Sequence, residues 1–185
     1  MLSPKSIILV SCVALSAAAA AAAVPPPNYV DLCYADITNL DADVKSLTAK
    51  VDSFNGDLVS VLPQLPLALQ AVVATAAAGL HSSLLPQPLP AADLLRLAGR
   101  VNTTIAADIP AAVNAFVAKE SAYEKAGLKT PVLLGLRLFL PLYERLANNI
   151  LDRVPADAPK DRVDVLKSDV QGIIDSLLKG IRAYE

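Results

Sequence analysis

The sequence predicts an all-α fold, a single antiparallel bundle of about five amphipathic helices. Three observations support this prediction. Hydrophobic residues make up 54% of the chain but aromatic residues only 4%, so the apolar content comes mainly from Ala, Leu and Val. Apolar residues recur at intervals of three and four along five segments, which is the spacing of one face of an α-helix. Proline-containing breaks separate these segments, and short connections favour antiparallel neighbours.

Two parts are expected in the 185 residues, a signal peptide at 1–23 and a single helical-bundle domain at 24–185. The basic Lys5 precedes a short apolar run, and the alanine tract Ala17–Ala23 supplies small residues for cleavage after Ala23. The alternative is a membrane anchor, but the apolar run is short for a span. No later segment looks long and apolar enough to cross a membrane, so we expect a secreted, extracellular protein without transmembrane anchoring.

Cysteine, histidine and charge counts exclude several classes of function. Removal of Cys12 would leave Cys33 alone, so an intramolecular disulfide is not expected. Cys33 lies on an apolar stripe, which favours a buried side chain over a reactive or intermolecular thiol. A single His leaves little material for a zinc site or a His-based triad. The net charge of −2 provides no cationic field for nucleic acid. We therefore expect a noncatalytic protein without cofactor or metal.

The first helix is predicted to begin near Val30 and to end at Asn55-Gly56, since both residues tolerate a left-handed backbone. Its apolar residues form a heptad stripe over more than three repeats. The stripe consists of Val30, Cys33, Ile37, Leu40, Val44, Leu47, Val51 and Phe54.

The second predicted helix covers residues 57–81, and Pro63 and Pro66 should bend or divide it early. A proline-rich loop follows it. The third helix is predicted at residues 91–123, with a kink at Pro110.

The fourth helix is predicted to begin with Thr130 as its N-cap and Pro131 as its first helical residue. Pro141 interrupts its leucine-rich first half. The fifth helix is predicted to begin near Pro159. Its apolar stripe is Val163, Leu166, Val170, Ile173, Leu177, Ile181 and Tyr184.

A few polar residues are candidates for functional sites by residue type. His81 is interpreted as an exposed histidine at a helix end, because no nucleophile-elbow pattern is present and a hydrolase would also need an orienting acid and an oxyanion site. The carboxylates of residues 152–169 lack the spacing of a calcium loop and are interpreted as a solvated face. Asn102 begins the glycosylation acceptor Asn-Thr-Thr, and its use depends on whether that helix face points outward.

The apolar content of the fourth helix exceeds what one buried face requires. Helices that splay at their prolines and carry Leu, Val and Phe can enclose an apolar cavity that holds a small ligand. The alternatives are a tightly packed core or a dimer interface.

Two stretches carry a family resemblance. The first is Tyr34–Thr48 followed by Val51–Gly56, and the second is Ala118–Leu128. Together they resemble the fungal hydrophobic surface-binding protein A family, also called antigenic cell wall galactomannoproteins, over residues 29–184. The resemblance implies a secreted or wall-associated helical bundle that adsorbs to hydrophobic surfaces. It also implies that fatty acids could occupy a central apolar cavity.

The ligand-binding residues are expected on the inward stripes of the predicted helices. They are Phe54, Phe116, Leu136, Phe139, Leu140, Tyr143, Ile174 and Leu177. A ligand carboxylate would need a polar or cationic group at the cavity mouth. Tyr143, Asn148, Lys119 and Arg137 are candidates, and the sequence does not choose among them.

The leading hypothesis is therefore a secreted, noncatalytic lipid-binding protein that holds fatty acid-like ligands. The alternative is a structural mannoprotein that adsorbs to the cell wall or to hydrophobic surfaces, with wall polysaccharide as a further partner. A secreted inhibitor of a wall enzyme would use two disulfides, which one mature cysteine argues against.

Overall fold

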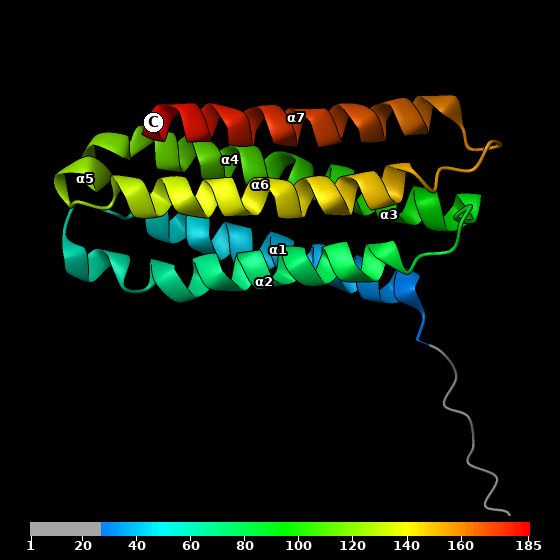
Figure 1. The fold of residues 1–185 in the computed structure, drawn as a ribbon, viewed down its shortest axis with the longest axis horizontal. Coiled ribbons are helices and arrows are strands. Elements are labelled where there is room, and N and C mark those ends of the chain that lie inside the picture. Colours follow the sequence, from blue (N-terminus) through cyan, green and yellow to red (C-terminus); the bar gives the residue numbers. More distant parts are fainter. Residues whose placement is uncertain (1–26) are drawn as a thin grey trace, which may run out of the picture.

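The computed structural model describes residues 27–185, and all regular secondary structure within them is helical. The elements are α1 (Tyr29–Asp52), the 3₁₀ helix η1 (Leu58–Val61), α2 (Gln64–Ser83), α3 (Ala91–Thr103), α4 (Ile105–Ala118), α5 (Glu120–Lys125), α6 (Lys129–Leu151) and α7 (Lys160–Tyr184). The long helices lie side by side in an elongated bundle (Figure 1), which confirms the all-α prediction. The predicted signal peptide lies outside the described residues.

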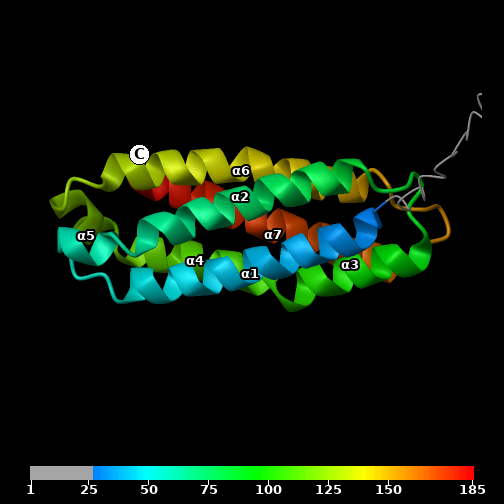
Figure 2. The ribbon, with the colours of Figure 1, turned by 90° about the horizontal axis from the view of Figure 1, so that it is seen from below.

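The bundle is a closed ring of five columns, in the order α1, α2, α6, α7 and the α3–α4 pair (Figure 2). Helices that follow one another in the chain, such as α1 and α2 or α6 and α7, run antiparallel, as predicted. Around the ring, however, α2 and α6 run in the same direction, and the α3–α4 pair runs in the same direction as both of its neighbours, α1 and α7. An antiparallel arrangement throughout is impossible in a closed ring with an odd number of columns.

The predicted stripe of α1 is buried along its whole length, and Cys33, Ile37, Leu40 and Val51 are completely inaccessible to solvent. Asn28 caps this helix, because its side-chain oxygen accepts hydrogen bonds from the backbone N–H groups of Val30 and Asp31. The chain then turns at Gly56, whose φ of 92° suits glycine.

The second predicted helix is divided at Pro63, the N-cap of α2, as its prolines suggested. The third predicted helix is divided at Thr104, where φ is −135° and ψ is −97°, and again at Lys119. Pro110 stays inside α4, so the main break lies six residues before the proline that was expected to cause it.

The start of α6 also differs from its prediction. The helix begins at Lys129 with Leu128 at the N-cap, so Pro131 is its third residue rather than its first. The reason lies in the preceding turn: Gly127 has a φ of 73°, and the Leu128 N–H donates to the Tyr123 carbonyl at 2.8 Å. These features are a Schellman motif at the C-terminus of α5. The chain enters α6 directly after it, so α6 begins two residues before the predicted first residue, Pro131.

Two stretches, Leu58–Ser83 and Ala91–Ala118, are long and apolar enough to cross a membrane by length and composition alone. The prediction that no later segment reaches this threshold is therefore wrong. Apolar core helices of soluble proteins pass the same test when they are buried. Only 22% of the first window is buried, against 39% of the second. The exposed character of Leu58–Ser83 therefore needs its own explanation.

Candidate functional site: an apolar cavity

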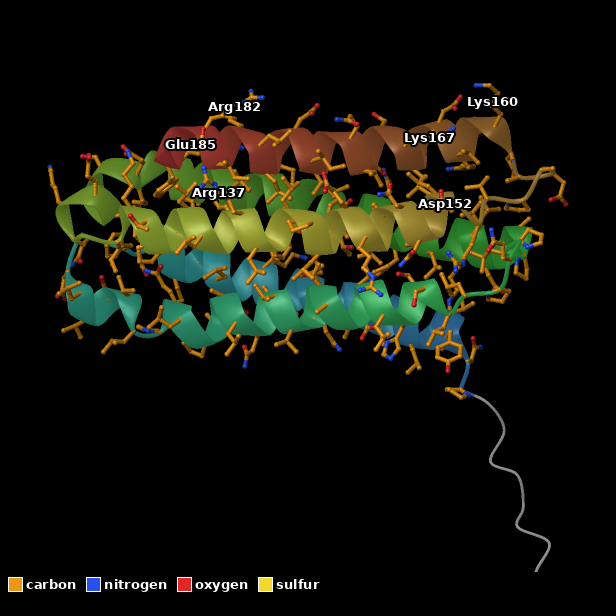
Figure 3. All side chains as sticks on the ribbon, viewed as in Figure 1. Arg137, Asp152, Lys160, Lys167, Arg182 and Glu185 are labelled. Carbon is orange, nitrogen blue, oxygen red and sulfur yellow. The ribbon has the colours of Figure 1, made fainter. Side chains whose placement is uncertain are left out.

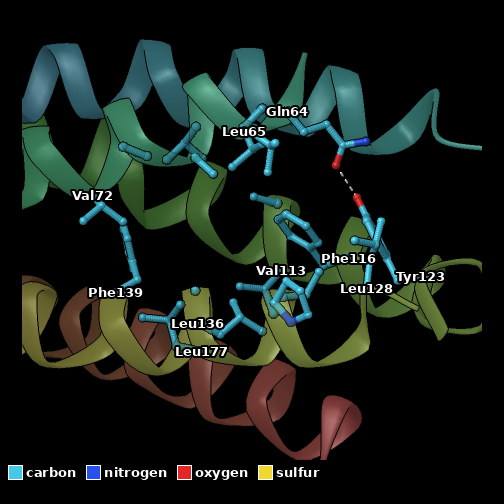
Figure 4. Close-up of a pocket in the computed structure, with 18 of the residues that line it drawn as sticks. Gln64, Leu65, Val72, Val113, Phe116, Tyr123, Leu128, Leu136, Phe139 and Leu177 are labelled. Atoms are coloured by element: carbon cyan, nitrogen blue, oxygen red, sulfur yellow. Dashed lines mark hydrogen bonds between the residues drawn. The ribbon is translucent and has the colours of Figure 1, made fainter. Parts of the chain in front are cut away.

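A cavity lies between α2, α4 and α6, at the end of the bundle that carries η1 and α5 (Figure 4). The cavity has a volume of about 170 Å³. Figure 4 shows Leu65 and Val72 facing Leu136 and Phe139 across it. The lining residues are Val44, Leu47, Val61, Gln64, Leu65, Ala68, Ala71, Val72, Ile109, Ala112, Val113, Phe116, Tyr123, Leu128, Pro131, Val132, Gly135, Leu136, Phe139 and Leu177.

Small residues create this space. The lining includes Ala68, Ala71, Ala112 and Gly135, which come from three different helices. A Cβ atom added at Gly135 would have no non-local atom within 4 Å. Because these short side chains face a common space, the helices reach van der Waals contact elsewhere and leave a void here.

The same two helices, α2 and α6, approach closely at the other end of the bundle. A Cβ atom at Gly79 would lie 3.7 Å from Arg145 Cδ and 3.8 Å from the Leu142 carbonyl oxygen. Asn149 Nδ2 donates to the Gly79 carbonyl at 3.0 Å. At the cavity end, Leu65, Pro131 and Gly135 are all exposed although they line the cavity. The opening to solvent therefore lies between α2 and α6 at these residues.

Tight packing closes the floor of the cavity against α7. A Cβ atom added at Gly180 would lie 2.7 Å from Val113 Cγ1 and 3.3 Å from Leu136 Cδ1. Val113 and Leu136 themselves line the cavity. Because Gly180 has no side chain, Val113 and Leu136 can pack against α7, and this sets how far they extend into the cavity.

Two of the lining residues carry polar side chains, Gln64 and Tyr123, and they bind each other. The Tyr123 hydroxyl donates to Gln64 Oε1, and Gln64 Nε2 donates to the Ser60 carbonyl at 3.2 Å. The Tyr123 ring stacks on Phe54 with a centroid distance of 4.3 Å. Burial raises the pKa of Tyr123 to about 12, so this end of the cavity holds a neutral phenol.

The sequence did not single out this pair. Gln64 stands alone among apolar residues between Pro63 and Pro66, and a polar side chain in such a run signals a buried hydrogen bond. Tyr123 lies in the second stretch that carries the family resemblance. Spacing could not reveal that the two meet, because they are 59 positions apart in the chain.

The structure brings Phe116, Leu136, Phe139 and Leu177 together in the lining. The other four residues expected there do not line the cavity. Phe54 lies behind Tyr123 in the core, and the remaining three lie elsewhere on the same helices. These three are Leu140, Tyr143 and Ile174. The predicted stripes run the full length of the helices, whereas the cavity occupies one end of the bundle.

None of the candidates for a polar mouth lines the cavity. Tyr143 is buried, and desolvation raises its pKa. Lys119 Nζ donates to the Phe54 carbonyl at 2.9 Å, and Arg137 pairs with Glu185 at 2.7 Å. Asn148 is exposed on α6 outside the cavity. The described lining thus contains no formally charged side chain.

Three other predictions concern single residues. Cys33 is free and fully buried, as predicted, and burial raises its thiol pKa to about 12. His81 is not a free exposed histidine: its Nδ1 lies 2.6 Å from Asp36 Oδ2, because α1 and α2 bring the two side chains together. Asn102 is exposed, and its Nδ2 donates to Asp169 at 2.9 Å. Among residues 27–185, no cluster of three potential metal ligands occurs.

A helical bundle with an open apolar cavity belongs to the class of folds that can hold a hydrophobic ligand between helices. The sequence identifies the family. The family model described as hydrophobic surface binding protein A matches residues 30–152, and the chain belongs to this family.

Solved structures share the fold. AFMP4P, solved in complex with palmitic acid, is 22% identical, with a TM-score of 0.76 over 84% of this chain and 99% of that one. Ligand binding domain 1 of the Penicillium marneffei MP1 protein, complexed with arachidonic acids, is 17% identical, with a TM-score of 0.74 over 85% and 99%. Domain 2 of the same protein, complexed with multiple arachidonic acids, is 19% identical, with a TM-score of 0.72 over 86% and 97%. The comparison with curated proteins gives no match.

Proposed function

We propose that this protein is a secreted, noncatalytic carrier that holds the hydrocarbon chain of a fatty acid in the cavity between α2, α4 and α6. One observation carries the proposal: the bundle has an apolar cavity that opens to solvent, and its lining contains no formal charge. Membership of the hydrophobic surface binding protein A family and the fatty acids bound by proteins of the same fold support it.

The hydrophobic gain is large enough for useful affinity. Each buried methylene contributes about 0.8 kcal/mol, so about fifteen of them, most of a long acyl chain, contribute roughly 12 kcal/mol before association costs. Those costs are several kcal/mol for a flexible ligand. Burial of the chain alone therefore supports micromolar binding without a specific polar contact.

The carboxylate is expected at the opening, near Leu65 and Gly135, with the chain pointing inward. The lining offers no cation, and an unpaired charge is costly to bury. Gln64 and Tyr123 already satisfy each other and are almost completely buried, so they close the end of the cavity near α5 rather than bind the carboxylate.

An extracellular location is part of the proposal. The order of basic, apolar and small residues at 1–23 supports secretion. The exposed side chain of Asn102 is available for glycosylation. A second candidate function, adsorption to a hydrophobic surface or the cell wall, is favoured by apolar side chains that remain exposed on η1 and α2.

Native mass spectrometry of the mature chain tests the carrier function, together with organic extraction of bound material. We expect a stoichiometric fatty-acid adduct, either copurified or formed after addition of palmitic or arachidonic acid. A clean apo mass and no uptake of either acid would overturn the carrier proposal, and adsorption would become the leading function.

A further inference from the structure

Most of the exposed large hydrophobic side chains lie on η1, on α2 or directly beside them. Of the twelve that stand out as exposed among residues 27–185, eight lie between Leu58 and Leu84, and each of these is at least 48% exposed. They are Leu58, Val59, Leu62, Leu65, Leu69, Val73, Leu80 and Leu84. Within α2, Leu65, Leu69 and Val73 follow one another at intervals of four, so they share one face of the helix. We call these eight residues the α2 apolar face.

This face lies in an uncharged part of the chain. No Asp, Glu, Lys or Arg occurs between Asp57 and Asp93, and the only His in that stretch is paired with Asp36. Figure 3 shows that labelled charged side chains such as Lys167 and Arg182 lie along α7, on the side of the bundle away from α2. The α2 apolar face itself carries no charge, and Asp36 and Asp43 of α1 border it beside Leu69 and Val73. Protein interfaces usually have a polar rim with charged groups, whereas the uncharged row of leucines on α2 suits contact with hydrocarbon.

The α2 apolar face is continuous with the cavity opening. Leu65 is 58% exposed and also lines the cavity. Across the opening, Gly135 lies next to Leu134 and near Leu138 on α6, and both leucines are more than half exposed. A ligand that leaves between α2 and α6 therefore emerges beside exposed apolar side chains of both helices.

We propose that the α2 apolar face docks on the surface of a phospholipid bilayer, and that fatty acid passes directly between bilayer and cavity through the opening at Leu65 and Gly135. This proposal rests on the fatty-acid carrier function and identifies where the ligand is loaded and released. Because the face carries no charge, docking requires no anionic lipid and is insensitive to salt.

Two double variants separate this face from other exposed apolar residues. Leu62→Gln with Leu69→Gln changes two residues of the α2 apolar face that do not line the cavity. Leu95→Gln with Val165→Gln changes exposed hydrophobic residues on α3 and α7 and is the matched control. All four positions are exposed, so both variants should fold, which thermal unfolding monitored by circular dichroism verifies.

Flotation with phosphatidylcholine vesicles measures docking. We expect the wild-type chain and the control to float with the vesicles equally at about 0.1 M and about 1 M salt, although the Debye length falls from about 10 Å to about 3 Å between the two. The Leu62→Gln, Leu69→Gln variant should bind vesicles at least about tenfold more weakly, since each buried leucine contributes strongly to partitioning. Equal flotation of the two double variants, or no flotation of the wild type, would overturn the proposal.

Transfer of a fluorescent fatty acid from protein to vesicles tests direct passage. For the wild type, the transfer rate should rise in proportion to vesicle concentration, because collision with the bilayer limits it. For the Leu62→Gln, Leu69→Gln variant, the rate should become independent of vesicle concentration, while fatty-acid uptake in solution stays unchanged. A wild-type rate independent of vesicle concentration would overturn direct passage.

Two further results separate bilayer docking from dimerisation of the chain and from failure of the carrier function. If sedimentation shows a wild-type dimer that the Leu62→Gln, Leu69→Gln variant converts to a monomer, the face binds a second copy of the chain and the bilayer proposal is wrong. If no form of the protein takes up fatty acid in solution, the carrier function itself fails, whatever the flotation result.

Discussion

Substitution of Gly135 by Phe should block the cavity without weakening the fold. Gly135 lies in the middle of α6 with an ordinary helical backbone, and no non-local atom lies within 4 Å of an added Cβ. Replacing glycine by alanine in a helix interior stabilises the helix by roughly 0.5–1 kcal/mol, and phenylalanine keeps part of this gain. The new ring would cover apolar lining on both sides of the opening. We therefore expect the free energy of unfolding to stay equal to that of the wild type or to rise by about 1 kcal/mol.

The effect on binding should be opposite in sign and larger. The whole cavity has a volume of about 170 Å³, and a benzyl group at Gly135 would occupy the part of it next to the opening. If it displaces about four methylenes of the ligand, the loss is about 3 kcal/mol, or roughly a hundredfold in affinity. Displacement of a fluorescent fatty acid measures this affinity, and urea unfolding measures the stability.

Gly172→Phe is the matched control. Gly172 lies in the middle of α7, is exposed, and also has no non-local atom within 4 Å of an added Cβ. This variant should bind fatty acid like the wild type. If Gly135→Phe folds normally and binds fatty acid as tightly as Gly172→Phe, the cavity is not the binding site and the reasoning from its geometry is refuted.

Three further predictions test the walls and the core. Gly180→Ala should lower the free energy of unfolding, measured by urea titration, by about 1–3 kcal/mol, because the added Cβ would lie 2.7 Å from Val113 Cγ1. Unchanged stability would contradict this close packing. Tyr123→Phe should lower the free energy of unfolding by about 1–3 kcal/mol, because it leaves Gln64 Oε1 without its hydrogen-bond donor. The affinity for fatty acid should change less than about tenfold, and a larger loss would place the ligand carboxylate at this pair. Cys33 should resist thiol reagents in the native mature chain and react once unfolded. In the folded chain the pKa of the Cys33 thiol is raised from 9.0 to about 12, so the thiol of the unfolded chain ionises at a lower pH than that of the folded chain. The free energy of unfolding should therefore fall as the pH rises from 9 to 10, and the Cys33→Ala variant should lack this fall.

The helices were predictable because their signals are local. The prediction that the stripe from Val30 to Phe54 is buried needs only helical spacing and neighbouring helices to pack against, and all of its members are buried. The division of the second predicted helix followed from Pro63, which cannot donate a backbone hydrogen bond. The break at Thr104 and the early start of α6 at Lys129 were not predictable in the same way. The first has an unusual backbone conformation without a proline, and the second depends on the Schellman turn at Gly127.

The cavity was harder to place than the core. Apolar spacing identifies residues that point inward, and it cannot tell whether an inward side chain meets another side chain or a void. Phe139 and Tyr143 are successive members of one stripe on α6, yet the first lines the cavity and the second is packed. The difference depends on what the neighbouring helices present at each level. At the level of Phe139 those neighbours include small residues such as Ala68 on α2, whose effect appears only when the helices are assembled.

The void and the exposed apolar face are best understood as two consequences of one asymmetry between α2 and α6. At one end Arg153 ties the helices together: its guanidinium donates to the carbonyls of Ser83 at 2.8 Å and Leu85 at 3.1 Å, and Asn149 reaches Gly79. At the other end no comparable polar contact joins the two helices, and the cavity opens between them. Imperfect packing costs stability, and the rest of the ring shows that this sequence can pack helices closely, as at Gly180. The void lies at the end of the bundle where α2 and α6 are not tied together, beside an uncharged and exposed helix. We therefore expect this arrangement to let a hydrocarbon chain enter without unfolding the bundle.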